Sequence, residues 1–199
     1  MDTLFTKETA EKFMKIRGEV RGLALRSHGE FILKERGPEG LELVEKIMKE
    51  SGYPIDHKSL GAMKFYPVGL ELIELLAIKK AFDFNDEKFI EMGVFSSKNS
   101  LIMRLFMKYF VSIDIMTKQA SRIWKKYYTI GDLKAIELNK DKRYLILRLK
   151  DFNIHPLHCL HVGGYLSSVV KMVVKKQVSC EEVKCIYRGD DCHEFLLRW

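Results

Sequence analysis

The spacing of the apolar residues in this 199-residue chain changes near Gly131, and this change limits the folds that the chain can adopt. Before Gly131, apolar side chains recur at steps of three and four, which is the period of an α-helix. After it, two short apolar stretches flank residues 139–141, a pattern typical of a two-stranded hairpin. A helix over residues 156–175 and a second hairpin then follow. We therefore expect an α+β fold, an antiparallel sheet of hairpins with helices packed on one face.

Residues 100–128 form the longest stretch with a helical period and predict a long central helix of about 28 residues. Its apolar face suits the core of the domain, and also the interface of a homodimer. Its aromatic and methionine side chains also suit the wall of a cavity for an apolar ligand. The residues that we expect to line this pocket are Phe106, Tyr109, Phe110, Ile113, Trp124, Tyr144, Ile146 and Leu166.

No segment rich in Pro, Gly or Ser divides the chain, so we expect a single domain over residues 1–199. Residues 1–130 form its mostly helical part, and residues 131–199 form the part with the hairpins. No apolar run approaches the about 20 residues of a membrane span, and the N-terminus lacks a signal peptide. We therefore expect no membrane span and a cytoplasmic location. The net charge of +7 permits contact with nucleic acid, but the basic residues are spread among 27 acidic ones, which indicates solvated faces instead.

Three cysteines near the C-terminus have the chemistry of metal ligands. If Arg188 and Gly189 form a two-residue loop, Cys185 and Cys192 face each other with Cβ atoms roughly 5 Å apart. Cys159 lies in the first turn of the helix that begins at Pro156, where the helix dipole should lower the pKa of its thiol. In a reducing compartment, metal binding is favoured over a disulfide. The histidines of the same region are expected to lie at helix edges or on the surface and not to bind metal; they are His155, His158, His161 and His193.

The order of these features resembles the 4-vinyl reductase domain over residues 136–199. The resemblance rests on a hairpin, a helix with Cys159 and residues 163–165 (Gly-Gly-Tyr), and a final motif that comprises Glu182, Cys185, Gly189, Asp190, Cys192 and Phe195. That family includes the sensory domains of phenol-responsive bacterial activators and is similar in fold to the small subunits of the trafficking transport particle. It implies one Zn²⁺ in a closed, structural site with the ligands Cys159, Glu182, Cys185 and Cys192. Cys180 remains an alternative to Glu182.

The resemblance implies a zinc-containing domain that binds a small hydrophobic or aromatic molecule and acts through a partner or a dimer. The sequence shows no dinucleotide-binding fingerprint and no recognisable catalytic set, so we expect that the protein is not an enzyme. Two alternatives stay open. One is a scaffolding or assembly subunit of the trafficking type, and the other is a component of a tetrapyrrole vinyl reductase.

Overall fold

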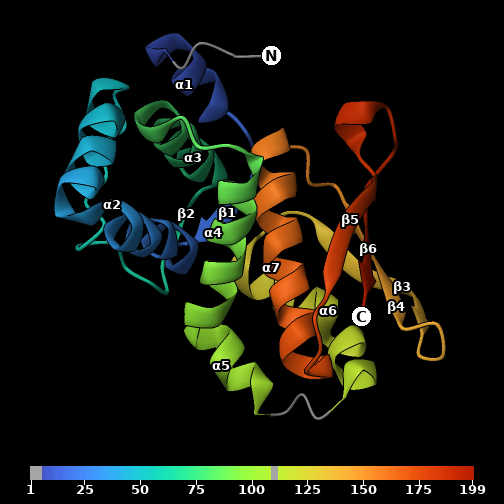
Figure 1. Cartoon of the computed structure of the whole chain (residues 1–199). Coiled ribbons are helices and arrows are strands. Elements are labelled where there is room, and N and C mark those ends of the chain that lie inside the picture. The colour runs from blue at the N-terminus through green and yellow to red at the C-terminus, as the bar shows by residue number, and fades with distance from the viewer. Residues whose placement is uncertain (1–5, 109–111) are drawn as a thin grey trace.

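A computed structural model describes residues 6–108 and 112–199, with helices first and an antiparallel sheet later (Figure 1). The expected α+β class is confirmed. The helices are α1 (Lys7–Phe13), α2 (Gly22–Glu50), α3 (Val68–Phe82), α4 (Asp86–Asn99), α5 (Leu101–Met107), α6 (Ile113–Tyr127) and α7 (Pro156–Val174).

The main sheet has four antiparallel strands in the order β3-β4-β6-β5. Its strands are β3 (Asp132–Asn139), β4 (Tyr144–Lys150), β5 (Ser179–Lys184) and β6 (His193–Arg198). In the inner strand β4, Leu145, Leu147 and Leu149 are buried while the residues between them are only partly buried. This alternation places one face of the sheet against α6 and α7. A second, two-stranded sheet pairs β1 (Glu19–Arg21) with β2 (Phe65–Pro67).

The single long helix predicted over residues 100–128 is wrong, because two helices, α5 and α6, occupy this part of the chain. Ser112 has an extended backbone, and its hydroxyl accepts a hydrogen bond from the backbone N–H of Ile115. Ser100 caps α5 in the same way by accepting from the N–H of Met103. A serine at an N-cap satisfies an N–H group that the helix itself leaves unpaired, so each serine favours a new helix start.

Helices α4 and α7 cross in very close contact, and two glycines make this possible (Figure 1). A Cβ atom at Gly93 would lie 2.0 Å from the carbonyl oxygen of His161, and one at Gly164 would lie 2.1 Å from that of Ile90. No side chain fits at either position without moving a backbone. Gly163 is different, because it faces the sheet and its nearest neighbours would be 3.8 Å from an added Cβ.

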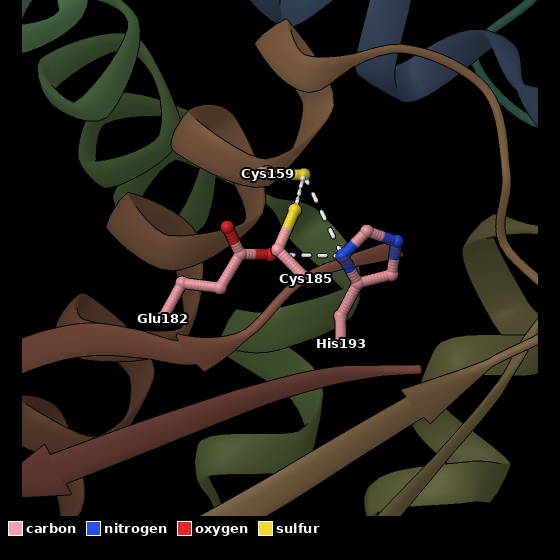
Figure 2. Close-up of side chains that lie close together, drawn as sticks. All are labelled: Cys159, Glu182, Cys185 and His193. Carbon is pink, nitrogen blue, oxygen red and sulfur yellow. Dashed lines mark hydrogen bonds and ion pairs between the residues drawn. The ribbon is translucent and has the colours of Figure 1, made fainter. Parts of the chain in front are cut away.

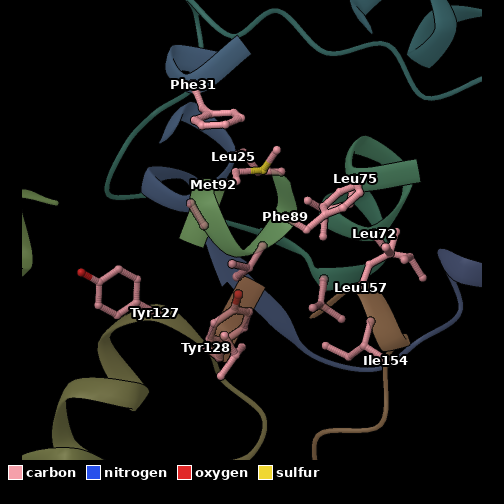
Figure 3. Close-up of a cluster of buried hydrophobic side chains, with 14 of the residues drawn as sticks. Leu25, Phe31, Leu72, Leu75, Phe89, Met92, Tyr127, Tyr128, Ile154 and Leu157 are labelled. Carbon is pink, nitrogen blue, oxygen red and sulfur yellow. The ribbon is translucent and has the colours of Figure 1, made fainter. Parts of the chain in front are cut away.

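Side chains from α2, α3, α4 and α7 form one continuous core, to which Tyr127 and Tyr128 belong at the end of α6 (Figure 3). Helix α7 corrects one prediction, namely that the sequence contains no apolar run of membrane-spanning length. By length and composition alone, its 19 residues would suffice to cross a membrane. However, α7 packs against α4, β5 and β6, so a role as the central core helix explains its apolar character.

Candidate functional site

A cavity of about 70 Å³ lies between the helical part and the sheet, with walls from α2, α4, α5, α6, α7, β3 and β4. Most of its wall is apolar, and none of the described lining residues is Asp, Glu, Lys or Arg. The polar side chains in the wall are Ser27, Ser96, Ser100, Trp124, Tyr127, Tyr128, His161 and Tyr165. A largely apolar space with a few converging polar groups is the usual form of a small-molecule site.

The structure places two of the eight predicted pocket residues, Trp124 and Leu166, in the wall of this cavity. Tyr109 and Phe110 lie outside the described residues. The remaining four are not among the described residues that line the cavity: Phe106, Ile113, Tyr144 and Ile146. Sequence reasoning missed most of the actual wall, which is drawn from five separate helices.

The phenol group of Tyr165 carries the one fully buried polar side-chain atom of the described cavity wall that has no hydrogen-bond partner. Its hydroxyl oxygen is fully buried. Its ring packs edge-on against that of Tyr127, with the ring centroids 5.6 Å apart. The hydroxyl of Tyr127, by contrast, is hydrogen-bonded to that of Ser100. Burial, and then the neighbouring Tyr127, raises the pKa of Tyr165 well above its usual value, so this phenol stays protonated. The hydroxyls of Tyr127 and Ser100 are close enough to influence this pKa, but neither meets the geometry of a hydrogen bond to Tyr165.

Behind the cavity wall, a chain of hydrogen bonds leads from His161 towards the surface. His161 Nε2 lies 3.2 Å from His28 Nε2, and His28 Nδ1 lies 2.9 Å from Glu74 Oε2. The other oxygen of Glu74, Oε1, is 2.7 Å from His57 Nε2, and His57 Nδ1 is 2.9 Å from Glu45 Oε1. His28 and Glu74 are fully buried, whereas the side chain of Glu45 is 28% exposed. This set of four residues, Glu45, His57, Glu74 and His28, is called the ionic chain below.

The directions of the pKa shifts of His57, His28 and Glu74 indicate that these three residues are charged. Burial opposes charge at His57, but hydrogen bonds and charge from Glu74 and Glu45 raise its pKa to about 9. The pKa of His28 is also raised, because Glu74 outweighs the effect of burial. Burial alone would raise the pKa of Glu74, but the two histidines lower it. The pKa of His161 lies well below its usual value because of burial and the nearby His28, so His161 is neutral and its Nε2 accepts from His28.

A second buried carboxylate, Glu71, lies one turn away on α3. The hydroxyl of Tyr128, which lines the cavity, donates to Glu71 Oε1 at 2.9 Å. His158 Nε2 lies 3.2 Å from Glu71 Oε2. Burying two carboxylates in one helix is costly unless each is paired, and here each has partners on two other segments.

A cluster of metal-ligand side chains lies beside the N-terminal part of α7, next to the sheet (Figure 2). One donor atom from each of Cys159, Glu182, Cys185 and His193 lies within 4.8 Å of the others. Cys159 Sγ is 4.0 Å from Cys185 Sγ and 3.6 Å from His193 Nδ1. His193 Nδ1 is also 2.8 Å from Glu182 Oε1. These donors come from α7, from β5, from the segment after β5 and from β6.

Cys192 was the predicted fourth ligand, but the structure places His193 in that position. The connection from β5 to β6 is not a two-residue loop, because Cys185 and Cys192 both lie outside the strands and a 3₁₀ turn, Ile186–Arg188, follows Cys185. His193 is the first residue of β6, and its ring faces the cluster, whereas Cys192 is not among the described donors that meet there. The Nε2 of His193 donates to the carbonyl oxygen of Phe152 at 3.2 Å, which leaves Nδ1 as the ligand atom.

Two further expectations about this region need correction. We expected the helix dipole to lower the pKa of Cys159, but burial and the charge of Glu182 raise it. We also placed the nearby histidines at helix edges or on the surface, whereas His158, His161 and His193 are buried. Cys180 does not belong to the cluster of described donors, and Glu182 does.

The fold has clear counterparts among solved structures, although no family model and no curated protein matches the chain. An H-NOX protein from S. oneidensis in the Fe(II) ligation state is 13% identical, with a TM-score of 0.68 over 89% of this chain and 95% of that one. An oxygen-binding H-NOX domain related to soluble guanylate cyclases, solved as an oxygen complex, is 14% identical, with a TM-score of 0.60 over 89% and 94%. A structure described in terms of haem redox potential and porphyrin distortion is also 14% identical, with a TM-score of 0.60 over 90% and 99%.

These comparisons overturn the predicted family. The similar structures are H-NOX proteins, so the resemblance to the 4-vinyl reductase domain and to the trafficking subunits is wrong. Zinc as the cofactor is wrong as well, because the descriptions of the similar structures refer to iron and haem. At this level of identity, the comparison shows a shared fold.

The cavity of this chain does not fit a haem group. Its volume of about 70 Å³ is below the about 150 Å³ of an engineered cavity that holds benzene, and a porphyrin is several times larger than benzene. The described wall offers no cationic side chain for the carboxylates of haem. Its one imidazole, that of His161, already accepts from His28 through Nε2. We therefore derive no role for haem in this protein.

Proposed function

We propose that this chain is a non-catalytic domain that binds a small, uncharged and mostly apolar molecule in the cavity and signals its presence to a partner. The observation that carries this proposal is the apolar cavity between the helical part and the sheet, whose wall contains no ionised side chain among the described residues. An ion placed there would lose its hydration without gaining a partner. The similar structures, which are described by the iron ligation state or the oxygen that they bind, support a sensor role for this fold.

The cavity volume limits the size of the ligand. About 70 Å³ is roughly half of the cavity that holds the six carbon atoms of benzene, which leaves room for about three heavy atoms. The best small ligands gain about 1.5 kcal/mol for each heavy atom, so three atoms give at most about 4.5 kcal/mol and a Kd near 1 mM. The aromatic ligand that we expected from the sequence is too large for the cavity in this arrangement.

Xenon under pressure tests this proposal, because xenon enters dry apolar cavities and needs no polar partner. The methyl groups of Met103 and Met116 line the cavity and provide NMR signals there. Xenon should shift both signals in a saturable way and leave the signal of Met63, an exposed residue, unchanged. The variant Ala120→Phe, which places a ring in the cavity, should abolish the shift. Unchanged Met103 and Met116 signals at saturating xenon would refute the proposal.

A sensor domain acts by coupling the occupancy of its cavity to an output. We propose a protein partner or a second copy of this chain, in the cytoplasm, as the recipient. Light scattering coupled to size exclusion, with and without xenon, tests the homodimer directly. A mass of one chain at all concentrations would leave a different protein as the partner.

A second proposal concerns the cluster of Cys159, Glu182, Cys185 and His193, whose four donor atoms favour the binding of a divalent cation. Co²⁺ is a suitable probe, because its thiolate complexes absorb in the near ultraviolet. Cys185→Ser should lower this absorbance, whereas Cys180→Ser, a substitution outside the cluster, should leave it unchanged. Equal spectra for both variants would show that the cluster does not bind the ion.

A further inference from the structure

We propose that the ligand of the cavity carries one hydrogen-bond acceptor, such as an ether or carbonyl oxygen, and that the hydroxyl of Tyr165 donates to it. This inference rests on the proposed function and names the chemical class of the ligand. It follows from four observations on the cavity: one orphaned hydroxyl, the satisfaction of the other polar groups, the lack of charge, and the small volume.

The orphaned hydroxyl is the first observation. The oxygen of Tyr165 is buried and unpaired in the wall of a largely apolar cavity. A buried polar group without a partner destabilises the folded protein. Such a group in an apolar cavity is therefore explained by a partner that arrives from outside the chain.

The other large polar side chains of the wall already have partners. Trp124 donates through Nε1 to the carbonyl oxygen of Ile130 at 2.8 Å. Tyr128 donates to Glu71, and Tyr127 is paired with Ser100. Among the described lining residues, only the hydroxyl of Tyr165 remains as a fully buried atom without a partner.

The chemistry of a phenol group decides between donor and acceptor. The hydroxyl of Tyr165 has one hydrogen to give and an oxygen that can accept. A ligand that only donates would leave this hydrogen unpaired, and unpaired buried donors are rarer in proteins than under-used acceptors. A ligand with an acceptor oxygen satisfies the hydrogen.

Charge and size narrow the class further. No ionised side chain lines the described cavity, so the acceptor belongs to a neutral molecule. The volume of about 70 Å³ admits about three heavy atoms. Dimethyl ether meets these requirements, and propane has the same shape without the acceptor. This pair isolates the single hydrogen bond.

The experiment measures the Kd of both gases for the wild-type protein and for Tyr165→Phe, through the methyl signals of Met103 and Met116. We expect Tyr165→Phe to weaken dimethyl ether relative to propane by about 2- to 12-fold, the effect of one net hydrogen bond. Tyr165→Phe should also unfold at the same or a higher denaturant concentration than the wild type, since it removes only an unpaired hydroxyl.

Three outcomes are informative. Binding of propane without any change in the ether-to-propane ratio would overturn this inference and leave the proposed function intact. A clear loss of stability in Tyr165→Phe would also overturn it, because the hydroxyl would then have a partner within the protein. If neither gas nor xenon binds the wild-type protein, the proposed function itself fails.

Discussion

The substitution Glu74→Gln tests whether the ionic chain behind the cavity is charged and stabilising. Glu74 is fully buried and faces two imidazoles, at 2.9 Å from His28 and 2.7 Å from His57. Removing one partner of a buried ion pair costs about 3 to 5 kcal/mol, because the other charge is left uncompensated. We expect a loss of this size at pH 7.

The pH dependence of the free energy of unfolding gives a second estimate of how strongly the ionic chain stabilises the protein. The pKa of His57 is raised from 6.5 to about 9 by Glu74 and Glu45, and each tenfold change in proton affinity is worth about 1.4 kcal/mol. The difference corresponds to about 3 kcal/mol of stability. For a raised pKa, this stability is fully present below the unfolded value of 6.5 and is lost as the pH rises through about 9. The groups that face His57 are Glu45, Glu74 and, more distantly, His28.

The assay is urea unfolding followed by tryptophan fluorescence at pH 6, 8 and 10. The wild type should lose about 3 kcal/mol between pH 6 and pH 10 from His57 alone. The gap between Glu74→Gln and the wild type should be widest at pH 6 and narrower at pH 10. The matched control is Glu35→Gln, at a carboxylate that pairs with Lys88 near the surface, where we expect a change below about 1 kcal/mol. A constant difference in stability between Glu74→Gln and the wild type across the whole pH range would refute the hypothesis that the ionic chain is charged. If Glu74→Gln does not fold, the pH dependence of wild-type stability tests this hypothesis by itself.

Two other predictions use neighbouring residues as controls. Gly164→Ala should lower the free energy of unfolding in urea by about 1 to 3 kcal/mol, because the added methyl group meets the backbone of Ile90. Gly163→Ala should leave the free energy of unfolding unchanged, because the space beside Gly163 accommodates a methyl group. Similar losses of stability in both variants would show that the contact between α4 and α7 is not tight. His193→Ala should lower Co²⁺ binding, measured by thiolate absorbance, whereas Cys192→Ser should leave it unchanged. A loss of Co²⁺ binding in Cys192→Ser but not in His193→Ala would favour the hairpin register predicted from the sequence.

The donor cluster shows which ligands can be predicted from the sequence and which cannot. The spacing indicated Cys159 and Cys185, the resemblance to the 4-vinyl reductase domain implied Glu182, and the structure brings the donor atoms of all three close together. The sequence predicted Cys192 in place of His193, because the hairpin register decides which of these two neighbours faces the cluster. The strand pairing shifts between Glu182 and Lys184, and a 3₁₀ turn follows. A shift of one residue reverses the face of every later side chain, so His193 takes the position predicted for its neighbour.

The ionic chain was missed for a different reason. The stretch 67–82 is strongly apolar, and its two glutamates, Glu71 and Glu74, are spaced three apart on one helical face. That spacing was a signal, since acidic side chains on an apolar helix face need buried partners. The partners themselves, His28 and His57, come from other segments. Only the tertiary structure shows the pairing, including the close approach of His57 to Gly29, where a Cβ would lie 2.4 Å from the ring.

The cavity shows that the fold determines where a ligand can bind, whereas the side chains determine which ligand fits. The aromatic periodicity over residues 100–128 was real, but a break before Ile113 divides the run into two helices, so only part of it reaches the cavity wall. The backbone resembles that of haem proteins, yet identities of 12–15% leave almost every lining residue free to differ. A fold can host unrelated ligands, because the side chains of the site decide what fits. In this chain, a neutral His161, an unpaired Tyr165 and a small volume select a neutral acceptor of few atoms.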